Sequence, residues 1–183
     1  MARQVLFVHG GGGGAYAADA KLVESLRARL GGDYVVRYPE LPNEEEPQYE
    51  VWKNAIAGEL AAMGSGAILV GHSIGGSVII RAVVDGDIGH SLAGVLLLSA
   101  PFWYEHDFWR WDEVKLPADA AERIPDGLPV FVVHGTQDES VPFAHAEMYA
   151  RALPQATLRP LDGRDHQLGE DLTEVARDIM LLR

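Results

Sequence analysis

Short apolar runs alternate with longer amphipathic segments along the whole chain. Six runs with the length and composition of buried strands lie at residues 5–8, 34–38, 67–70, 94–98, 130–133 and 157–161. Between them, apolar side chains recur at helical spacing in two stretches that end at Gly31 and Gly64, and again in residues 172–182. This alternation predicts a parallel sheet covered by helices on both faces.

The composition of the runs predicts their order in the sheet. Central strands of a parallel sheet are apolar throughout, whereas edge strands carry polar residues. The second run contains Arg37 and the sixth contains Arg159 and Pro160, so these two are expected at the edges. The predicted fold is α/β, a doubly wound, mostly parallel six-stranded sheet in the order 2-1-3-4-5-6. Ligands of such sheets lie beyond the C-terminal ends of the strands, where the winding direction switches, here between the first and third strands.

No repeat or linker divides the chain, so residues 1–183 are expected to form a single domain. That length is enough to bury roughly 70% of the surface of the unfolded chain. The one long segment outside the strand–helix pattern, residues 101–127, follows the fourth run. We expect it to form a small lid or excursion.

Composition excludes several functional classes. The net charge of −12 and the lack of a basic patch argue against nucleic acid as a partner. The seven histidines show none of the spacings of zinc-binding motifs, and there is no cysteine, so no metal or other cofactor is expected. Apolar runs are too short for a signal peptide or a membrane span. A cytoplasmic protein without a membrane partner is predicted, and its oligomeric state stays open.

Five consecutive glycines, residues 10–14, follow the first strand and precede a predicted helix. Backbone amides at such a turn suit the binding of negative charge. Two chemistries use it. One is a dinucleotide pyrophosphate, because Gly10, Gly12 and Ala15 fit the loose G-x-G-x-x-G/A pattern and Glu40 resembles a ribose-binding acid. The other is the oxyanion of an acyl-transfer intermediate.

The third run leads into Gly-His-Ser-Ile-Gly at residues 71–75, which fits the G-x-S-x-G turn that presents a serine above a sheet. Serine is a weak nucleophile unless a base accepts its proton, and that base needs an anionic partner. Asp138 and His166 each follow a strand run by five residues. Both therefore fall at the same edge of the sheet as Ser73, in the chain order Ser, Asp, His.

Together these motifs resemble the α/β-hydrolase family, over nearly the whole chain. The length and small lid are similar to the compact serine hydrolases of the retinoblastoma-binding-protein-9-like and YdeN-like group. The segments that carry the resemblance are HGGGGG after the first strand, GHSIGG as nucleophile elbow, HGTQDESVP as acid loop and GRDH as histidine loop. The resemblance implies that Ser73 is the nucleophile, Asp138 the acid and His166 the base.

A hydrolase of this pattern also needs two backbone N–H donors for the oxyanion. We expect them at Ile74 and Gly11, with Gly12 as the next choice for the second. The dinucleotide hypothesis is less favoured because it leaves the serine, aspartate and histidine without a role. Asp162 and Asp165 remain alternatives for the acid. The other histidines at strand ends are expected to bond local backbone or to flank the site: His9, His72 and His134.

Aromatic residues are concentrated in the predicted lid, including Trp103, Trp109 and Trp111 out of four tryptophans in the chain. They predict either packing under the excursion or an apolar substrate pocket over Ser73, and the two roles are compatible. The predicted function is a cofactor-free serine hydrolase acting on a small-molecule substrate with a carboxylic ester-like bond. Thioester, lactone, amide and short-peptide substrates, and perhydrolysis, stay open. The alternative is a protein-binding module on a hydrolase fold with a vestigial site.

Overall fold

The computed structural model describes residues 2–88, 91–105 and 108–182. Its centre is one six-stranded sheet in the order β2-β1-β3-β4-β5-β6, and each neighbouring pair of strands is parallel. The strands are β1 (Arg3–Val8), β2 (Tyr34–Arg37), β3 (Ala67–His72), β4 (Leu92–Leu98), β5 (Val130–Gly135) and β6 (Thr157–Leu161). The predicted fold and strand order are confirmed.

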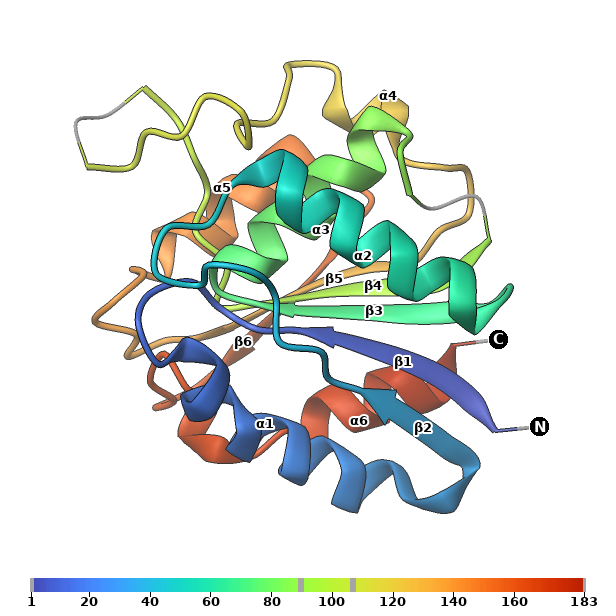
Figure 1. The fold of residues 1–183 in the computed structure, drawn as a ribbon. Coiled ribbons are helices and arrows are strands. Elements are labelled where there is room, and N and C mark those ends of the chain that lie inside the picture. The colour runs from blue at the N-terminus through green and yellow to red at the C-terminus, as the bar shows by residue number, and fades with distance from the viewer. Residues whose placement is uncertain (1, 89–90, 106–107, 183) are drawn as a thin grey trace.

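Helices cover both faces of the sheet. They are α1 (Ala15–Leu30), α2 (Tyr49–Met63), α3 (Ile74–Asp85), α4 (Ala120–Arg123), α5 (Ala144–Ala152) and α6 (Thr173–Leu181), with short 3₁₀ turns at Gly31–Asp33 and Leu168–Glu170. Figure 1 shows α1 and α6 below the sheet and α2, α3 and α5 above it. Within the described ranges, none of these helices combines the length and apolar character needed to cross a membrane.

Burial explains the strand order. Every residue of β3 is buried, and a separate apolar core fills the space on each side of the sheet. The edge strands instead carry arginines that form ion pairs with helix carboxylates. Arg37 of β2 pairs with Glu59 at 3.4 Å, and Arg159 of β6 pairs with Asp178 at 2.6 Å. The parallel arrangement brings the C-terminal ends of all six strands to one edge, opposite the chain termini (Figure 1).

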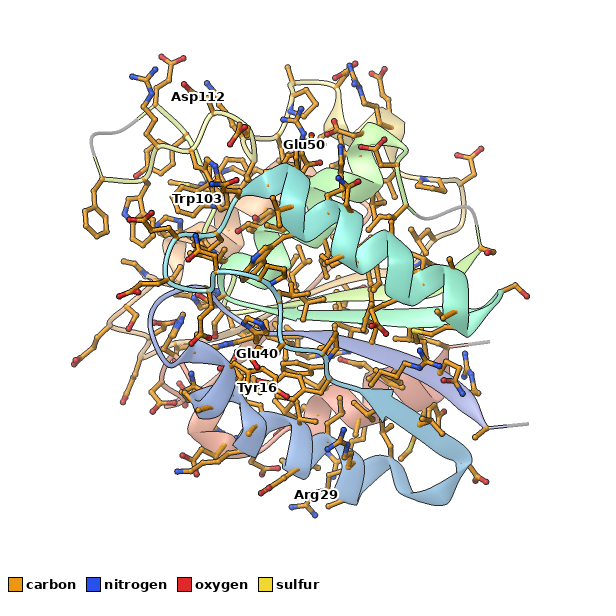
Figure 2. The ribbon with its side chains drawn as sticks, viewed as in Figure 1. Tyr16, Arg29, Glu40, Glu50, Trp103 and Asp112 are labelled. Atoms are coloured by element: carbon orange, nitrogen blue, oxygen red, sulfur yellow. The ribbon has the colours of Figure 1, made fainter. Side chains whose placement is uncertain are left out.

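The segment 101–127 leaves the end of β4 and forms an irregular excursion over the α2–α3–α5 layer, with α4 as its one helix in the described part. His106 and Asp107 of this predicted lid lie outside the described residues. Trp103 and Trp111 are partly buried against the core of that layer, whereas Asp112 is exposed at the outer side of the excursion (Figure 2). The segment therefore packs on the body through its aromatic side.

Candidate active site

Ser73 lies in the tight turn between β3 and α3. Its backbone has φ 51° and ψ −125°, a conformation that is strained for a residue with a side chain. The two motif glycines make this turn possible. A Cβ on Gly71 would lie 2.7 Å from the Gly76 nitrogen, and one on Gly75 would collide with the His9 carbonyl oxygen. The turn thereby holds Ser73 at the C-terminal edge of the sheet.

His166 and Asp138 extend a chain of hydrogen bonds from this serine. His166 Nε2 lies 3.2 Å from Ser73 Oγ, and His166 Nδ1 lies 2.8 Å from Asp138 Oδ2. The second carboxylate oxygen of Asp138 accepts the backbone amides of Ser140 at 2.9 Å and Val141 at 2.8 Å. Because a carboxylate only accepts, a neutral His166 ring in this position has its proton on Nδ1, which leaves Nε2 to accept from the serine hydroxyl.

The Asp138 carboxylate is held in its ionised form. Burial would raise the pKa of this carboxyl, but hydrogen bonds from His134, His166 and the Val141 amide outweigh it and hold the pKa well below its usual range. His134 is fully buried at the end of β5. Its Nε2 donates to the Val141 carbonyl at 2.8 Å and lies 3.2 Å from Asp138 Oδ2. A permanent negative charge therefore faces the His166 ring.

Gly135, the last residue of β5, lets the two loops meet. A Cβ there would collide with the carbonyl oxygens of Arg164 and Asp165, just before His166. The loops are joined by a hydrogen bond from the Gln137 amide to the Arg164 carbonyl at 2.9 Å. Close backbone contact at this point carries His166 within reach of Asp138.

The two other aspartates of the histidine loop point to different partners. Asp162 Oδ1 accepts the Thr136 hydroxyl at 3.1 Å, and Asp165 Oδ1 accepts the Gly169 amide at 2.9 Å. Both residues are exposed. The structure thus brings Asp138, rather than either alternative, to the histidine.

The amides of the glycine loop differ in their partners. The Gly10 amide donates to Asp19 Oδ2 at 2.8 Å and the Gly12 amide to the Glu44 carbonyl at 2.6 Å. The amides of Gly11 and of the exposed Gly13 have no acceptor in the described part of the chain. Ile74 is the first residue of α3, and the first amides of a helix have no acceptor within it. Gly11 is packed beside Ile74, since a Cβ on Gly11 would lie 2.9 Å from Ile74 Cδ1.

The N-terminus of α1 already holds an anion, the side chain of Glu44. Its Oε1 accepts the Gly14 amide at 2.8 Å and its Oε2 the Tyr16 amide at 2.7 Å. The Tyr16 hydrogen bond, opposed by burial and aided by Gly14, lowers the pKa of the Glu44 carboxyl. Figure 2 shows Tyr16 at this end of α1. The place that a dinucleotide pyrophosphate needs is therefore filled by the chain itself.

The structure also assigns partners to buried polar residues near Ser73. His9 accepts the Leu41 amide at Nε2 (2.8 Å) and contacts the Gly10 carbonyl through Nδ1 (2.7 Å), so it ties the loop after β2 to the glycine loop. His72 bonds Asp19 at 2.9 Å. Across the described ranges, no group of three or more metal-ligating side chains has a geometry that could hold a metal ion.

Asp19 and Glu44 have no predicted role in the site. The sequence pattern could have indicated a buried role for Asp19. This residue lies three, four and seven positions before Leu22, Val23 and Leu26 and so shares their buried helix face. A carboxylate on an apolar stripe indicates a buried partner. No sequence pattern indicates the role of Glu44, because it belongs to an acidic run in a loop, and such runs are most often solvated.

The tryptophan cluster consists of Trp103 and of Trp109 and Trp111, which both contact Trp103 edge to face. The Trp103 ring lies 5.5 Å from Trp111 and 6.0 Å from Trp109, centroid to centroid. Trp109 packs on His145 at 4.4 Å, and His145 Nδ1 accepts the Phe102 amide at 3.0 Å. Burial lowers the pKa of His145. His145 thus anchors the excursion to the start of α5.

Comparison with known proteins agrees with this architecture. The model of the family described as serine hydrolase matches residues 22–167. Among solved structures, the ydeN gene product from B. subtilis has a TM-score of 0.80 at 22% identity, covering 97% of both chains. An esterase from Rhodococcus sp. has a TM-score of 0.75 at 18% identity, covering 100% of this chain and 92% of its own. A monoacylglycerol lipase from Paleococcus ferrophilus has a TM-score of 0.69 at 20% identity, covering 96% and 91%. No curated protein matches. The α/β-hydrolase fold and the expected likeness to YdeN are confirmed.

Proposed function

Because the chain belongs to the serine hydrolase family, we propose that it hydrolyses carboxylic ester-like bonds through Ser73, His166 and Asp138. One observation carries the proposal. The serine hydroxyl, the imidazole and the carboxylate form an unbroken series of hydrogen bonds of 3.2 Å and 2.8 Å, from three loops that are far apart in sequence. That series matches what an activated serine requires: a base in reach of the hydroxyl and an anion that fixes the tautomer of the base.

In the first half of the reaction, His166 Nε2 accepts the proton of Ser73 Oγ as the oxygen attacks the substrate carbonyl carbon. The carbonyl π electrons move to oxygen, and the amides of Gly11 and Ile74 donate to that oxyanion. Asp138 stabilises the imidazolium that forms. When the tetrahedral intermediate collapses, the bond to the leaving alcohol breaks, His166 gives its proton to the alkoxide, and an acyl-enzyme remains.

In the second half, a water molecule takes the place of the alcohol. His166 accepts a proton from the water as its oxygen attacks the acyl carbon, and the same two amides hold the second oxyanion. Collapse breaks the bond to Ser73 Oγ, which recovers its proton from His166, and the carboxylic acid leaves. His166, Ser73 and water supply and accept every proton that is transferred, so the scheme uses no cofactor.

The tryptophan cluster supports a small apolar acyl or alcohol group as the preferred part of the substrate. Its rings meet at Trp103 on the excursion that follows β4, the strand next to the Ser73 turn. Pockets lined by aromatic rings recognise apolar groups through burial, at about 0.8 kcal/mol per methylene. Comparison with an esterase and a lipase supports an ester substrate.

The proposal is tested with a series of p-nitrophenyl esters. The wild-type protein should release p-nitrophenol with saturation kinetics, and Ser73→Ala should fall to the background rate. Ser65→Ala is the matched control, because Ser65 is exposed just before β3, at the opposite end of that strand from Ser73. Turnover by the Ser73→Ala variant at the wild-type rate, or no turnover by wild type on any ester, would overturn the proposal.

A further inference from the structure

Beside the Ser73 turn lies a second, fully enclosed aspartate–histidine pair that the proposed reaction does not use. Asp19 of α1 and His72 of β3 are each only 1% exposed. His72 Nδ1 lies 2.9 Å from Asp19 Oδ2, and His72 Nε2 lies 3.0 Å from the backbone carbonyl oxygen of His166. The pair therefore contacts the main chain of His166, the proposed base, and not the ring nitrogens of His166.

The hydrogen-bond partners of His72 and Asp19 indicate the charges of the two side chains. Both ring nitrogens of His72 face oxygens, one of a carbonyl and one of a carboxylate. A carbonyl can only accept, so Nε2 must carry a proton. Asp19 already accepts the Gly10 amide at Oδ2 (2.8 Å) and the Gln167 side-chain amide at Oδ1 (3.1 Å), which favours the ionised carboxylate. With Asp19 ionised, Nδ1 donates as well, which makes His72 an imidazolium.

Asp19 therefore gathers donors from three segments that surround Ser73. Gly10 belongs to the glycine loop and precedes Gly11, the proposed oxyanion donor. His72 directly precedes Ser73. Gln167 directly follows His166. The contact between loop and turn is tight, because a Cβ on Gly10 would lie 3.3 Å from Ser73 Cβ. A single buried carboxylate thus joins the oxyanion loop, the nucleophile turn and the histidine loop.

We propose that His72, held as an imidazolium by Asp19, is a positioning residue that sets the separation between His166 and the oxyanion-binding loop around Ser73. This inference rests on the proposed function. Misplacement of reacting groups by about 1 Å is enough to cost roughly 100-fold in rate. Loss of the second ring proton would remove one of the two hydrogen bonds of His72 and free either the His166 main chain or Asp19.

The proposal predicts a specific pH dependence. The groups that face His72 are Asp19 from α1, the His166 ring at 4.9 Å between centroids, and the Asp138 charge from the loop after β5. Burial would lower the pKa of His72, but its hydrogen bond and charge interaction with Asp19 raise it above the ordinary histidine value. The same partner lowers the pKa of Asp19 against the opposing effect of burial. The bridge is therefore complete between the lowered pKa of Asp19 and the raised pKa of His72, and is lost as pH rises through the pKa of His72.

Nuclear magnetic resonance of wild-type protein with ¹⁵N-labelled histidine tests the charge directly. At neutral pH we expect both ring nitrogens of His72 to show a bonded proton. As pH rises, kcat on a p-nitrophenyl ester should fall over the same pH range in which the His72 ring loses one of these two protons. A His72 ring with a single proton at neutral pH would overturn the proposal. So would a kcat that stays constant while the ring titrates in a folded protein.

Asp19→Asn tests the positioning role, with Asp178→Asn as matched control. Asp178 is also buried and ion-paired, with Arg159, but lies on α6 against the edge strand β6. We expect Asp19→Asn to lower kcat by about 10- to 100-fold with a smaller change in KM, and Asp178→Asn to lower the melting temperature without lowering kcat. Equal kcat in the two folded variants overturns the positioning role alone. Absence of ester turnover in wild type overturns the proposed function and, with it, the inference.

Discussion

Replacement of Asp138 by asparagine should abolish most of the activity, and the structure shows why the loss will be large. The new side chain has one acceptor oxygen and one amide donor in place of two acceptors. The amides of Ser140 and Val141, at 2.9 Å and 2.8 Å from Oδ1, both require that oxygen. Its NH₂ group must then occupy the position of Oδ2, 2.8 Å from His166 Nδ1.

This arrangement forces the wrong tautomer on His166. An NH₂ donor at that position requires an unprotonated Nδ1, so the single imidazole proton moves to Nε2, which can no longer accept the proton of Ser73. The opposite rotamer of the asparagine would place three N–H donors together at a cost of about 1–3 kcal/mol or more. We therefore expect kcat to fall by roughly 10⁴, which corresponds to about 5 kcal/mol of transition-state stabilisation.

Steady-state kinetics on a p-nitrophenyl ester provides the assay. Asp162→Asn and Asp165→Asn serve as matched controls, because they make the same chemical change in exposed carboxylates that bond Thr136 and Gly169. These two variants should stay within about threefold of wild type, as expected for surface sites. An Asp138→Asn protein with more than a tenth of the wild-type kcat, or a larger loss in Asp165→Asn, would refute the assignment of the acid.

Other substitutions probe the supports of the site. Gly135→Ala should lower kcat by about 100-fold, because the new Cβ collides with the main chain before His166. Gly32→Ala is the control and should keep its kcat, because no atom lies within 4 Å of the new Cβ. Equal kinetics of the two variants would contradict the proposed loop contact. Glu44→Gln should lower the free energy of unfolding by about 1 kcal/mol at neutral pH. Since the pKa of Glu44 is lowered in the folded protein, wild type should lose this advantage as pH falls below the usual glutamate range, and a constant difference down to low pH would exclude the contact. Alanine substitutions in the tryptophan cluster should flatten the dependence of kcat/KM on acyl length, which in wild type should peak at short to medium chains; an unchanged profile would assign these rings to packing alone.

The fold could be predicted from the sequence because each of its determinants is local. Arginines in the second and sixth runs mark edge strands, and the fully apolar third run marks a central one. The sheet order then follows from burial. The gathering of Ser73, Asp138 and His166 was also predictable, since loops that follow parallel strands share one edge of the sheet.

The supporting contacts depend on geometry that no periodicity encodes. The choice of Gly11 over Gly12 as the proposed oxyanion donor rests on a single hydrogen bond from Gly12 to Glu44, in a loop without regular structure. His72 looked like a residue that flanks the turn. Its two ring nitrogens face oxygens of Asp19 on α1 and of the His166 main chain after β6, and these contacts depend on how the segments pack together.

The intact mass of the protein after treatment with a fluorophosphonate shows whether Ser73 is an activated nucleophile. We expect one adduct per chain in wild type, located at Ser73 by peptide mapping, and none in Ser73→Ala. Labelling of His166→Ala should be much slower, because without the base the hydroxyl keeps its proton. An unmodified wild-type mass, or an adduct that maps to another residue, would show that Ser73 is not the nucleophile.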